Sequence, residues 1–256
     1  MIFDSHAHYD DEAFDGDRDE LLAGLAAQGV GAVVNVSADL ISADTTLELT
    51  NKWDFIYGTA GVHPSDTEKL DRAGMEHLEQ ILSQPKIAAV GEIGLDYHWP
   101  DPERGLQQEW FYAQLELAKS HDAPIVIHSR EAAKDTFDIM KAAGGAGLSA
   151  VIHCFSYEKE MAREFLRLGY YIGIGGVLTF KNARKLREVV AYMPMEAMLL
   201  ETDCPYMAPV PFRGKRNDSA KLHEVVRAIS QIRGISDEEV EAITWQNACR
   251  FYRISL

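Results

Sequence analysis

The chain has 256 residues, and its 40 acidic residues outnumber its 25 basic residues, which gives a formal net charge of −15 at pH 7. Hydrophobic residues make up 46% and charged residues 25% of the sequence, as in an average globular protein. This composition excludes a collagen, an extended coiled coil and a wholly disordered chain. The acidic balance also argues against a broad basic face for non-specific binding of nucleic acid.

The cysteines and the N-terminal segment indicate where the protein works. Three cysteines, few and odd in number, are typical of a reducing compartment rather than of a secreted disulfide scaffold. The sequence holds no apolar run long enough to cross a bilayer, and residues 1–20 carry eight carboxylates instead of a basic and then apolar leader. We therefore expect a cytoplasmic protein with no membrane partner.

Short β-rich segments alternate with segments of helical periodicity along the chain. The expected strands cover 2–5, 32–36, 55–59, 87–90, 125–127, 150–152, 170–174 and 198–200. The expected helices include 17–28 and 103–120, whose apolar residues recur on one face, and two C-terminal helices at about 219–232 and 237–249. Ser236, with Glu239 three residues later, predicts a capping box at the start of the last helix.

Alternating strands and helices predict parallel βαβ units. Eight such units match a (β/α)8 TIM barrel, which typically has about 250 residues. The competing fold is a doubly wound open sheet, which often has a glycine-rich first turn. Here the first strand leads into Ser5-His6-Ala7-His8 instead. Because no Pro/Gly/Ser-rich linker divides the sequence, we expect residues 1–256 to form a single barrel domain.

In such a barrel the chemistry gathers where the strands end. Histidines and carboxylates fall near the ends of strands one, three, four, five, six and eight, at His6, His8, His63, Glu92, His128, His153 and Asp203. Alternate strand residues point to one side, so both imidazoles of His6-x-His8 can enter the barrel mouth. Each histidine alone is also compatible with a hydrogen-bonded core residue, but their convergence with two carboxylates favours a metal site.

The candidate metal ligands are His6, His8, Glu92, His128, His153 and Asp203. This mixed nitrogen and oxygen set suits Zn²⁺, Mn²⁺, Fe²⁺, Co²⁺, Ni²⁺ or Mg²⁺. Six ligands exceed the need of one catalytic ion and suit two ions about 3.5–4 Å apart, with Glu92 as the bridge. Two other histidines, His63 and His98, either bind an anionic substrate or pack within loops. Cys154 and Cys204 are expected to be packing residues.

Six motifs in order resemble the TatD family of metal-dependent deoxyribonucleases, from Ile2 to about Asn247. They are Asp4-Ser5-His6-Ala7-His8, Gly61-Val62-His63-Pro64, Gly91-Glu92-Ile93-Gly94-Leu95-Asp96-Tyr97, Ile127-His128-Ser129-Arg130, His153-Cys154-Phe155 and Leu200-Glu201-Thr202-Asp203-Cys204-Pro205-Tyr206. One departure is Asp218-Ser219, where the family usually has Glu-Pro at the entry to the helix after strand eight.

The resemblance implies an amidohydrolase-type barrel with two divalent metals. Carried over by motif, His6, His8, Glu92 and Asp203 would bind the first ion. The second ion would be bound by Glu92, His128 and His153. The resemblance also implies hydrolysis of DNA phosphodiesters, often from the 3′ end.

The hypothesised mechanism uses a metal-activated hydroxide that attacks phosphorus in line. Asp203, with Glu92 as bridge, would orient this nucleophile or take its proton. His63 and Arg130 are the candidates for holding the phosphate, although Arg130 is also compatible with a salt bridge on a first helical turn. Because of the acidic net charge, we expect the nucleic-acid partner to be a DNA or oligonucleotide end. A small basic cluster of Arg213, Lys215 and Arg216 either guides this end or is a solvated loop.

Two other functions remain open on the same sequence. The first is hydrolysis of an amide, an ester such as a lactone, or a small phosphoester, although related binuclear barrels commonly bridge their metals with a carbamylated lysine from strand four. No lysine lies between Lys86 and Lys119 to serve in that way. The second is a metal-binding or partner-binding protein without turnover. No obligate protein partner is evident, and a monomer is expected.

Overall fold

The computed structural model describes residues 1–256 and contains one parallel sheet of eight strands in sequence order. The strands are β1 (Ile2–Ala7), β2 (Val30–Asn35), β3 (Ile56–Ala60), β4 (Ile87–Asp96), β5 (Ile125–Arg130), β6 (Ala150–Ile152), β7 (Tyr171–Ile174) and β8 (Met198–Leu200). The segment after β8 closes the barrel, because the backbone amides of Thr202 and Asp203 donate to the carbonyl of His6. This order and closure confirm the (β/α)8 barrel and exclude the doubly wound sheet.

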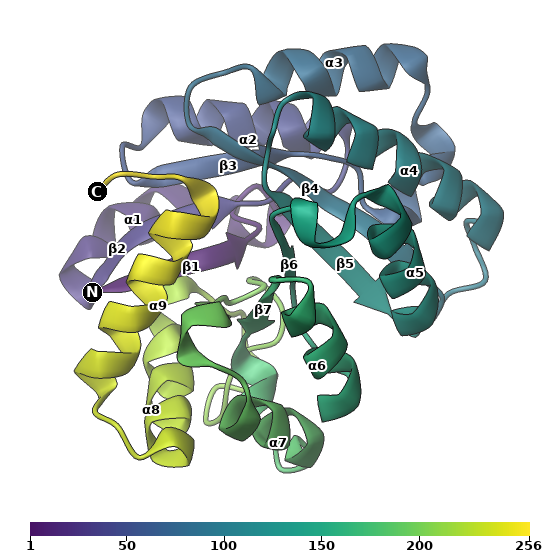
Figure 1. Ribbon diagram of the computed structural model, residues 1–256. Helices are drawn as coiled ribbons and strands as arrows, with labels where there is room; N and C mark the ends of the chain where they lie inside the picture. The colour runs from purple at the N-terminus through teal and green to yellow at the C-terminus, as the bar shows by residue number, and fades with distance from the viewer.

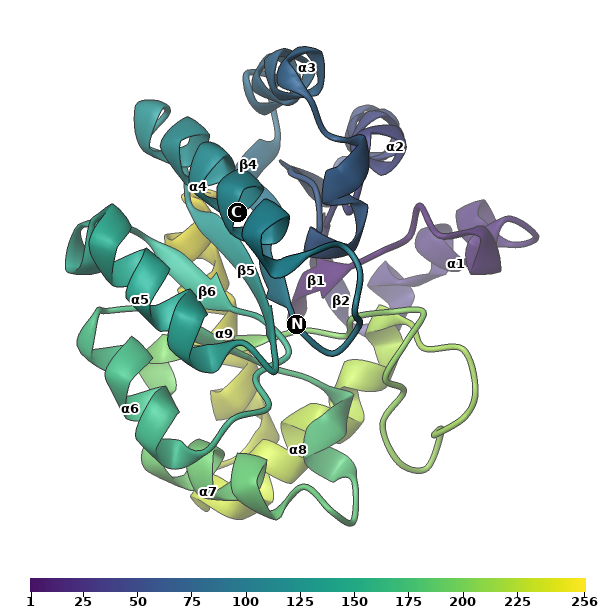
Figure 2. The same cartoon turned by 90° about the vertical axis from the view of Figure 1, so that its right-hand side faces the viewer.

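Helices surround the strands (Figures 1 and 2). They are α1 (Arg18–Gly24), α2 (Leu40–Lys52), α3 (Arg72–Leu82), α4 (Arg104–Ser120), α5 (Ala133–Ala143), α6 (Lys159–Arg167), α7 (Arg184–Tyr192), α8 (Leu222–Arg233) and α9 (Asp237–Tyr252). The last helix packs Ala248, Phe251 and Tyr252 into a buried cluster with apolar residues of six strands. Because the Tyr252 hydroxyl also donates to the carbonyl of Ser5, α9 is fastened to β1.

The structure shifts several predicted boundaries. The expected helix 17–28 is α1 followed by a short 3₁₀ turn, Ala26–Gln28, which ends at the left-handed Gly29. The expected strand at 87–90 continues to Asp96, so Glu92 lies inside β4 rather than at its end. The capping box of Ser236 and Glu239 is present as predicted.

The departure at Asp218-Ser219 has a structural role at the entry to α8. The side chain of Asp218 caps a 3₁₀ turn, Ser219–Lys221, and α8 begins at Leu222 rather than at 219. The buried Ser219 hydroxyl donates to the Asp4 carboxylate over 2.6 Å and lies 2.7 Å from the Tyr9 hydroxyl. The serine therefore ties the α8 entry to the first strand.

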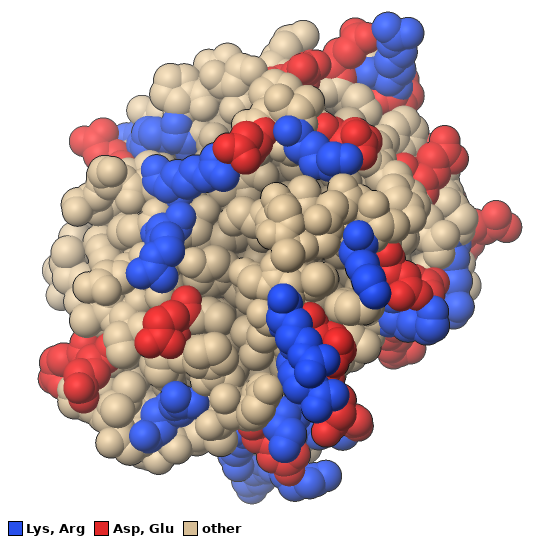
Figure 3. Space-filling view, viewed as in Figure 1, with Lys and Arg blue, Asp and Glu red and all other residues tan.

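Charged residues are mixed on the face that α9 covers. Figure 3 shows lysines and arginines beside aspartates and glutamates there, with no broad patch of one sign. None of the helices combines the length and the apolar character that crossing a bilayer requires.

A glycine in β4 sets how closely this strand approaches β5. Gly94 has φ 142°, and an added Cβ would collide with the backbone carbonyl of His128. We expect Gly94→Ala to push the strands apart and to lower the free energy of unfolding by about 3 kcal/mol. Gly105→Ala, in the open first turn of α4, is the matched control and should be neutral or slightly stabilising. Urea unfolding of both variants measures the difference, and equal midpoints would contradict this prediction.

Candidate metal centre

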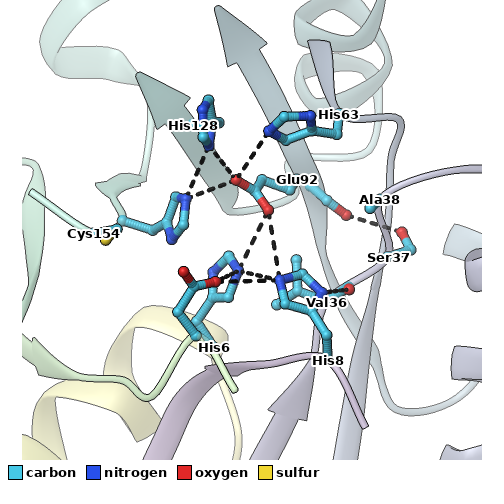
Figure 4. A network of polar contacts seen from close by, with 12 residues as sticks. His6, His8, Val36, Ser37, Ala38, His63, Glu92, His128 and Cys154 are labelled. Atoms are coloured by element: carbon cyan, nitrogen blue, oxygen red, sulfur yellow. Dashed lines mark hydrogen bonds and ion pairs between the residues drawn. The ribbon is translucent and has the colours of Figure 1, made fainter. Parts of the chain in front are cut away.

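The carboxylate of Glu92 lies at the middle of a cluster of histidines (Figure 4). Its side chain is only 4% exposed. The Oε1 atom is 2.7 Å from His128 Nδ1 and 2.6 Å from His153 Nε2. The Oε2 atom is 3.4 Å from His6 Nε2 and 3.9 Å from His8 Nε2. The two oxygens of one carboxylate therefore face separate sets of imidazoles.

Within each pair the ring nitrogens face each other. His6 Nε2 is 3.1 Å from His8 Nε2, and His128 Nδ1 is 3.2 Å from His153 Nε2. Two nitrogen lone pairs at this distance repel each other unless a proton or a cation lies between them. The nitrogen and carboxylate donors also suit borderline divalent ions such as Zn²⁺. The cluster thus fits a metal centre on its own chemistry.

Asp203 completes the side of the cluster that holds the first histidine pair. Its Oδ1 atom is 3.4 Å from His8 Nε2 and 3.8 Å from His6 Nε2. The residue has φ 57°, a left-handed conformation that aspartate tolerates better than most residues do. Its amide donates to the His6 carbonyl over 2.9 Å, so the barrel closure itself holds the carboxylate in place.

Protonation differs strongly among these histidines. Burial opposes the charged form of His8 and His128, but the carboxylates of Asp203, Asp96 and Glu92 outweigh it and raise their pKa values to about 10 and about 9. Burial lowers the pKa of His6 to about 4, assisted by the charge of His153. With no ion bound, the cluster therefore holds protons on some imidazoles and none on others at neutral pH.

His63 lies at the edge of the same cluster, with Nε2 3.8 Å from Glu92 Oε1. Burial lowers its pKa to about 3, and the charge of His128 acts in the same direction, so the ring is neutral. Its Nδ1 accepts a hydrogen bond from the Ser65 amide over 3.1 Å. In a neutral ring the proton then sits on Nε2, on the side of Glu92. His63 consequently offers the centre a hydrogen-bond donor rather than a positive charge.

The remaining predicted residues lie outside the histidine cluster. Arg130 ends β5 and is exposed, with its guanidinium 6.0 Å from the Trp99 ring and no carboxylate partner. His98 pairs with Glu131 over 2.7 Å. In the expected basic cluster, Arg216 forms two hydrogen bonds to Asp17, so only Arg213 and Lys215 are free of carboxylates. Figure 2 shows the segment between β8 and α8, which carries them, looping out from the barrel.

Two carboxylates at the centre were not singled out from the sequence. Asp96 Oδ2 is 3.3 Å from His128 Nε2, which orients that ring with Nδ1 toward Glu92. Glu201 is buried, lies close enough to ring nitrogens of His6 and His153 to share an ion with them, and accepts a hydrogen bond from the Cys154 amide. Strand periodicity could have identified both, because alternate residues of a strand share a face and Asp96 and Glu201 lie an even number of residues from Glu92 and Asp203, respectively.

Of the two cysteines beside the centre, Cys204 packs in a buried apolar cluster and Cys154 does not. Burial raises the pKa of the Cys154 and Cys204 thiols well above its usual value, so both thiols are protonated. Cys204 is fully buried, as expected, whereas Cys154 is only partly buried and has φ 43°. Neither is poised as a nucleophile.

Comparison with known proteins identifies the family to which this chain belongs. The model of the family described as TatD related DNase matches residues 3–253. The chain belongs to the TatD family. It is 38% identical over 255 residues to the uncharacterized metal-dependent hydrolase YabD of Bacillus subtilis, covering all of both chains. It is also 38% identical to the uncharacterized metal-dependent hydrolase TatD of Mycobacterium tuberculosis, with 98% of this chain and 97% of the relative covered.

Solved structures agree with this membership. The crystal structure of YjjV, a TatD homolog from Escherichia coli, superposes with a TM-score of 0.94 at 32% identity, covering 99% of this chain and 98% of that one. The TatD-family chain described here is therefore a metal-dependent hydrolase with a TIM-barrel fold.

Proposed function

We propose that this chain is a divalent-metal-dependent phosphodiesterase that removes nucleotides from the 3′ end of DNA. The observation that carries the proposal is the Glu92 carboxylate, whose two oxygens face separate sets of imidazoles. A shared carboxylate between two sets of nitrogen donors is the arrangement that a pair of catalytic ions needs for phosphoryl displacement. The family description as a DNase supports DNA as the substrate.

In this proposal the six ligands divide between two ions. His6, His8, Glu92 and Asp203 would hold the first, and Glu92, His128 and His153 would hold the second. Asp96 orients His128 by accepting a hydrogen bond from Nε2, the ring nitrogen that faces away from Glu92. When bound, divalent ions supply Lewis acidity, which acidifies water and neutralises charge on the phosphate.

The chain's own residues would then move the proton and hold the phosphate. Asp203 accepts the proton of the attacking water, since its ionised carboxylate is at the cluster and held by the barrel closure. His63 donates a hydrogen bond from Nε2 to a phosphate oxygen. Arg130 offers a planar fork that suits bidentate contact with phosphate.

A direct assay tests the proposed function. The purified protein is given a 3′-tailed oligonucleotide and, separately, a p-nitrophenyl phosphodiester, each with Mg²⁺, Mn²⁺, Co²⁺ or Zn²⁺. We expect shortening of the oligonucleotide from its 3′ end and hydrolysis of the small ester with at least one metal. Cleavage of the small ester alone would overturn DNA as the substrate. Cleavage of neither would overturn the phosphodiesterase.

Binding of the metal should release protons at neutral pH. With no ion bound, His8 and His128 titrate near 10 and 9 and carry protons at pH 7, whereas ligands must be neutral. We expect at least two protons released per fully loaded chain, because burial opposes the charged form of the His153 ligand but Glu92 outweighs it and raises its pKa as well. The affinity should weaken about tenfold per pH unit for each proton as the pH falls.

Calorimetry in buffers of different ionisation enthalpy counts these protons. His77→Gln, which removes an exposed histidine paired with Asp44, is the control and should leave the count unchanged. A binding enthalpy independent of the buffer would contradict the prediction.

A further inference from the structure

Three arginines with neither a carboxylate nor a backbone partner follow strand ends of this acidic protein. Most arginines form ion pairs or hydrogen bonds to backbone carbonyls, such as Arg227 with Glu224. Among the few that do neither, three lie over an aromatic ring. These pairs are Arg104 with Tyr97, Arg130 with Trp99 and Arg213 with Phe180, at 4.3, 6.0 and 4.3 Å from guanidinium carbon to ring centre.

All three arginines follow the strand ends that surround the candidate metal centre. Arg104 begins α4 after the loop that leaves β4, Arg130 is the last residue of β5, and Arg213 lies between β8 and α8. Proteins bind single-stranded nucleic acid with surfaces that combine cationic side chains and exposed aromatic rings. The rim therefore offers three unpaired cations although the whole chain carries a net charge of −15.

Trp99 is the most exposed of the three rings. Its exposed fraction is 57%, whereas Tyr97 is only partly exposed and Phe180 is buried. The ring is propped by an edge-to-face contact with His98, at 4.7 Å between centroids, and His98 is itself held by Glu131. An indole held in place with much of its surface free costs little entropy when a flat ligand stacks on it.

The Trp99 side chain lies within reach of the centre. Asp96 touches His128, and Trp99 follows Asp96 by three residues, which span at most about 11 Å of backbone. Arg130 follows His128 by two residues, and its backbone pairs with Asp96 in the sheet. Trp99 and Arg130 therefore lie close to the centre, at the ends of β4 and β5.

We propose that Trp99 and Arg130 form a subsite for the nucleotide next to the reacting phosphate. The base of that nucleotide stacks on the indole, and the guanidinium binds the reacting phosphate to which the nucleotide is joined. This inference rests on the proposed function and names the substrate as an unpaired DNA end, because a base can reach the indole only when it is free of a partner strand.

Binding without metal isolates this subsite from catalysis. A fluorescein-labelled oligothymidylate is titrated in EDTA against wild type, Trp99→Ala and Trp99→Phe. We expect the Kd to rise about tenfold for Trp99→Ala and to recover most of the way for Trp99→Phe, which keeps a stacking ring. Tyr192→Ala is the matched control, since Tyr192 is 47% exposed and also lies under a cation, Lys159, but it ends α7 and does not follow the end of a strand.

Two further measurements test the contact with the base and the contact with the phosphate separately. An oligonucleotide that lacks one base at the position next to its 3′ end should bind wild type about as weakly as the intact strand binds Trp99→Ala. The two losses should not add when combined, because both remove the same contact. Arg130→Gln should lower the slope of log Kd against log salt by about 0.7, the value for one phosphate contact of a single strand.

The outcomes distinguish this inference from the proposed function. If wild type cleaves the oligonucleotide but Trp99→Ala binds it as tightly as wild type does, only the subsite is wrong. The same holds if the losses from the missing base and from Trp99→Ala add fully. If wild type hydrolyses small esters but neither binds nor cleaves oligonucleotides, the DNA substrate and the subsite both fail.

Discussion

Replacing Glu92 with glutamine is expected to reduce phosphodiester hydrolysis at least about a thousandfold and to remove bound metal. A residue that only hydrogen-bonds to a metal ligand already contributes about 10- to 100-fold to metal affinity or activity. A ligand shared by both sets of imidazoles should therefore contribute more. The glutamine amide is neutral and presents an NH₂ group to one histidine pair instead of an oxygen. Elemental analysis after dialysis, together with the oligonucleotide assay, measures both effects.

A remote pair provides the control for this variant. Asp44 and His77 form a carboxylate–imidazole contact of 2.9 Å on the surface of α2 and α3, so Asp44→Asn removes a similar contact without touching the centre. Its metal content and turnover should equal those of wild type. If Glu92→Gln kept its metal and stayed within about threefold of wild-type activity, Glu92 would not be the shared ligand.

The order and type of most elements follow from local patterns. Strand and helix periods, together with the absence of a linker, were sufficient to predict the barrel, and Ser236 with Glu239 was sufficient to predict how α9 begins. Boundaries that depend on tertiary contacts were not predictable in this way. β4 extends to Asp96 because it pairs with β5 as far as Arg130, a contact that no local window of sequence contains.

At the candidate site, too, some features follow from the local sequence and others depend on tertiary contacts. Histidines at strand ends converge because the strands are parallel, so His6, His8, His128 and His153 could be grouped from the sequence alone. Protonation could not be predicted, since the neutral state of His63 comes from burial and from the nearby charge of His128. The role of Asp96 depends on which nitrogen of His128 faces it, and only the three-dimensional arrangement determines that.

Asp203→Asn is expected to lower kcat by about a hundred- to ten-thousandfold, the usual contribution of a general base. Asparagine matches aspartate in shape and tolerates the left-handed φ of 57°, so the barrel closure through the His6 carbonyl should persist. Its carbonyl oxygen can still serve as a metal ligand, but the amide cannot accept the proton from water. The variant therefore separates proton transfer from metal binding.

The measurement compares kcat with metal content for Asp203→Asn and for Asp203→Ala. We expect Asn to keep most of the metal and lose turnover, and Ala to lose both, because it removes the oxygen that faces His6 and His8. Circular dichroism spectra identical to that of wild type would show that both variants fold. Turnover of Asp203→Asn within about threefold of wild type, with the metal retained, would assign the proton to another acceptor. Glu201, which is buried beside His6 and His153, would then be the next residue to replace.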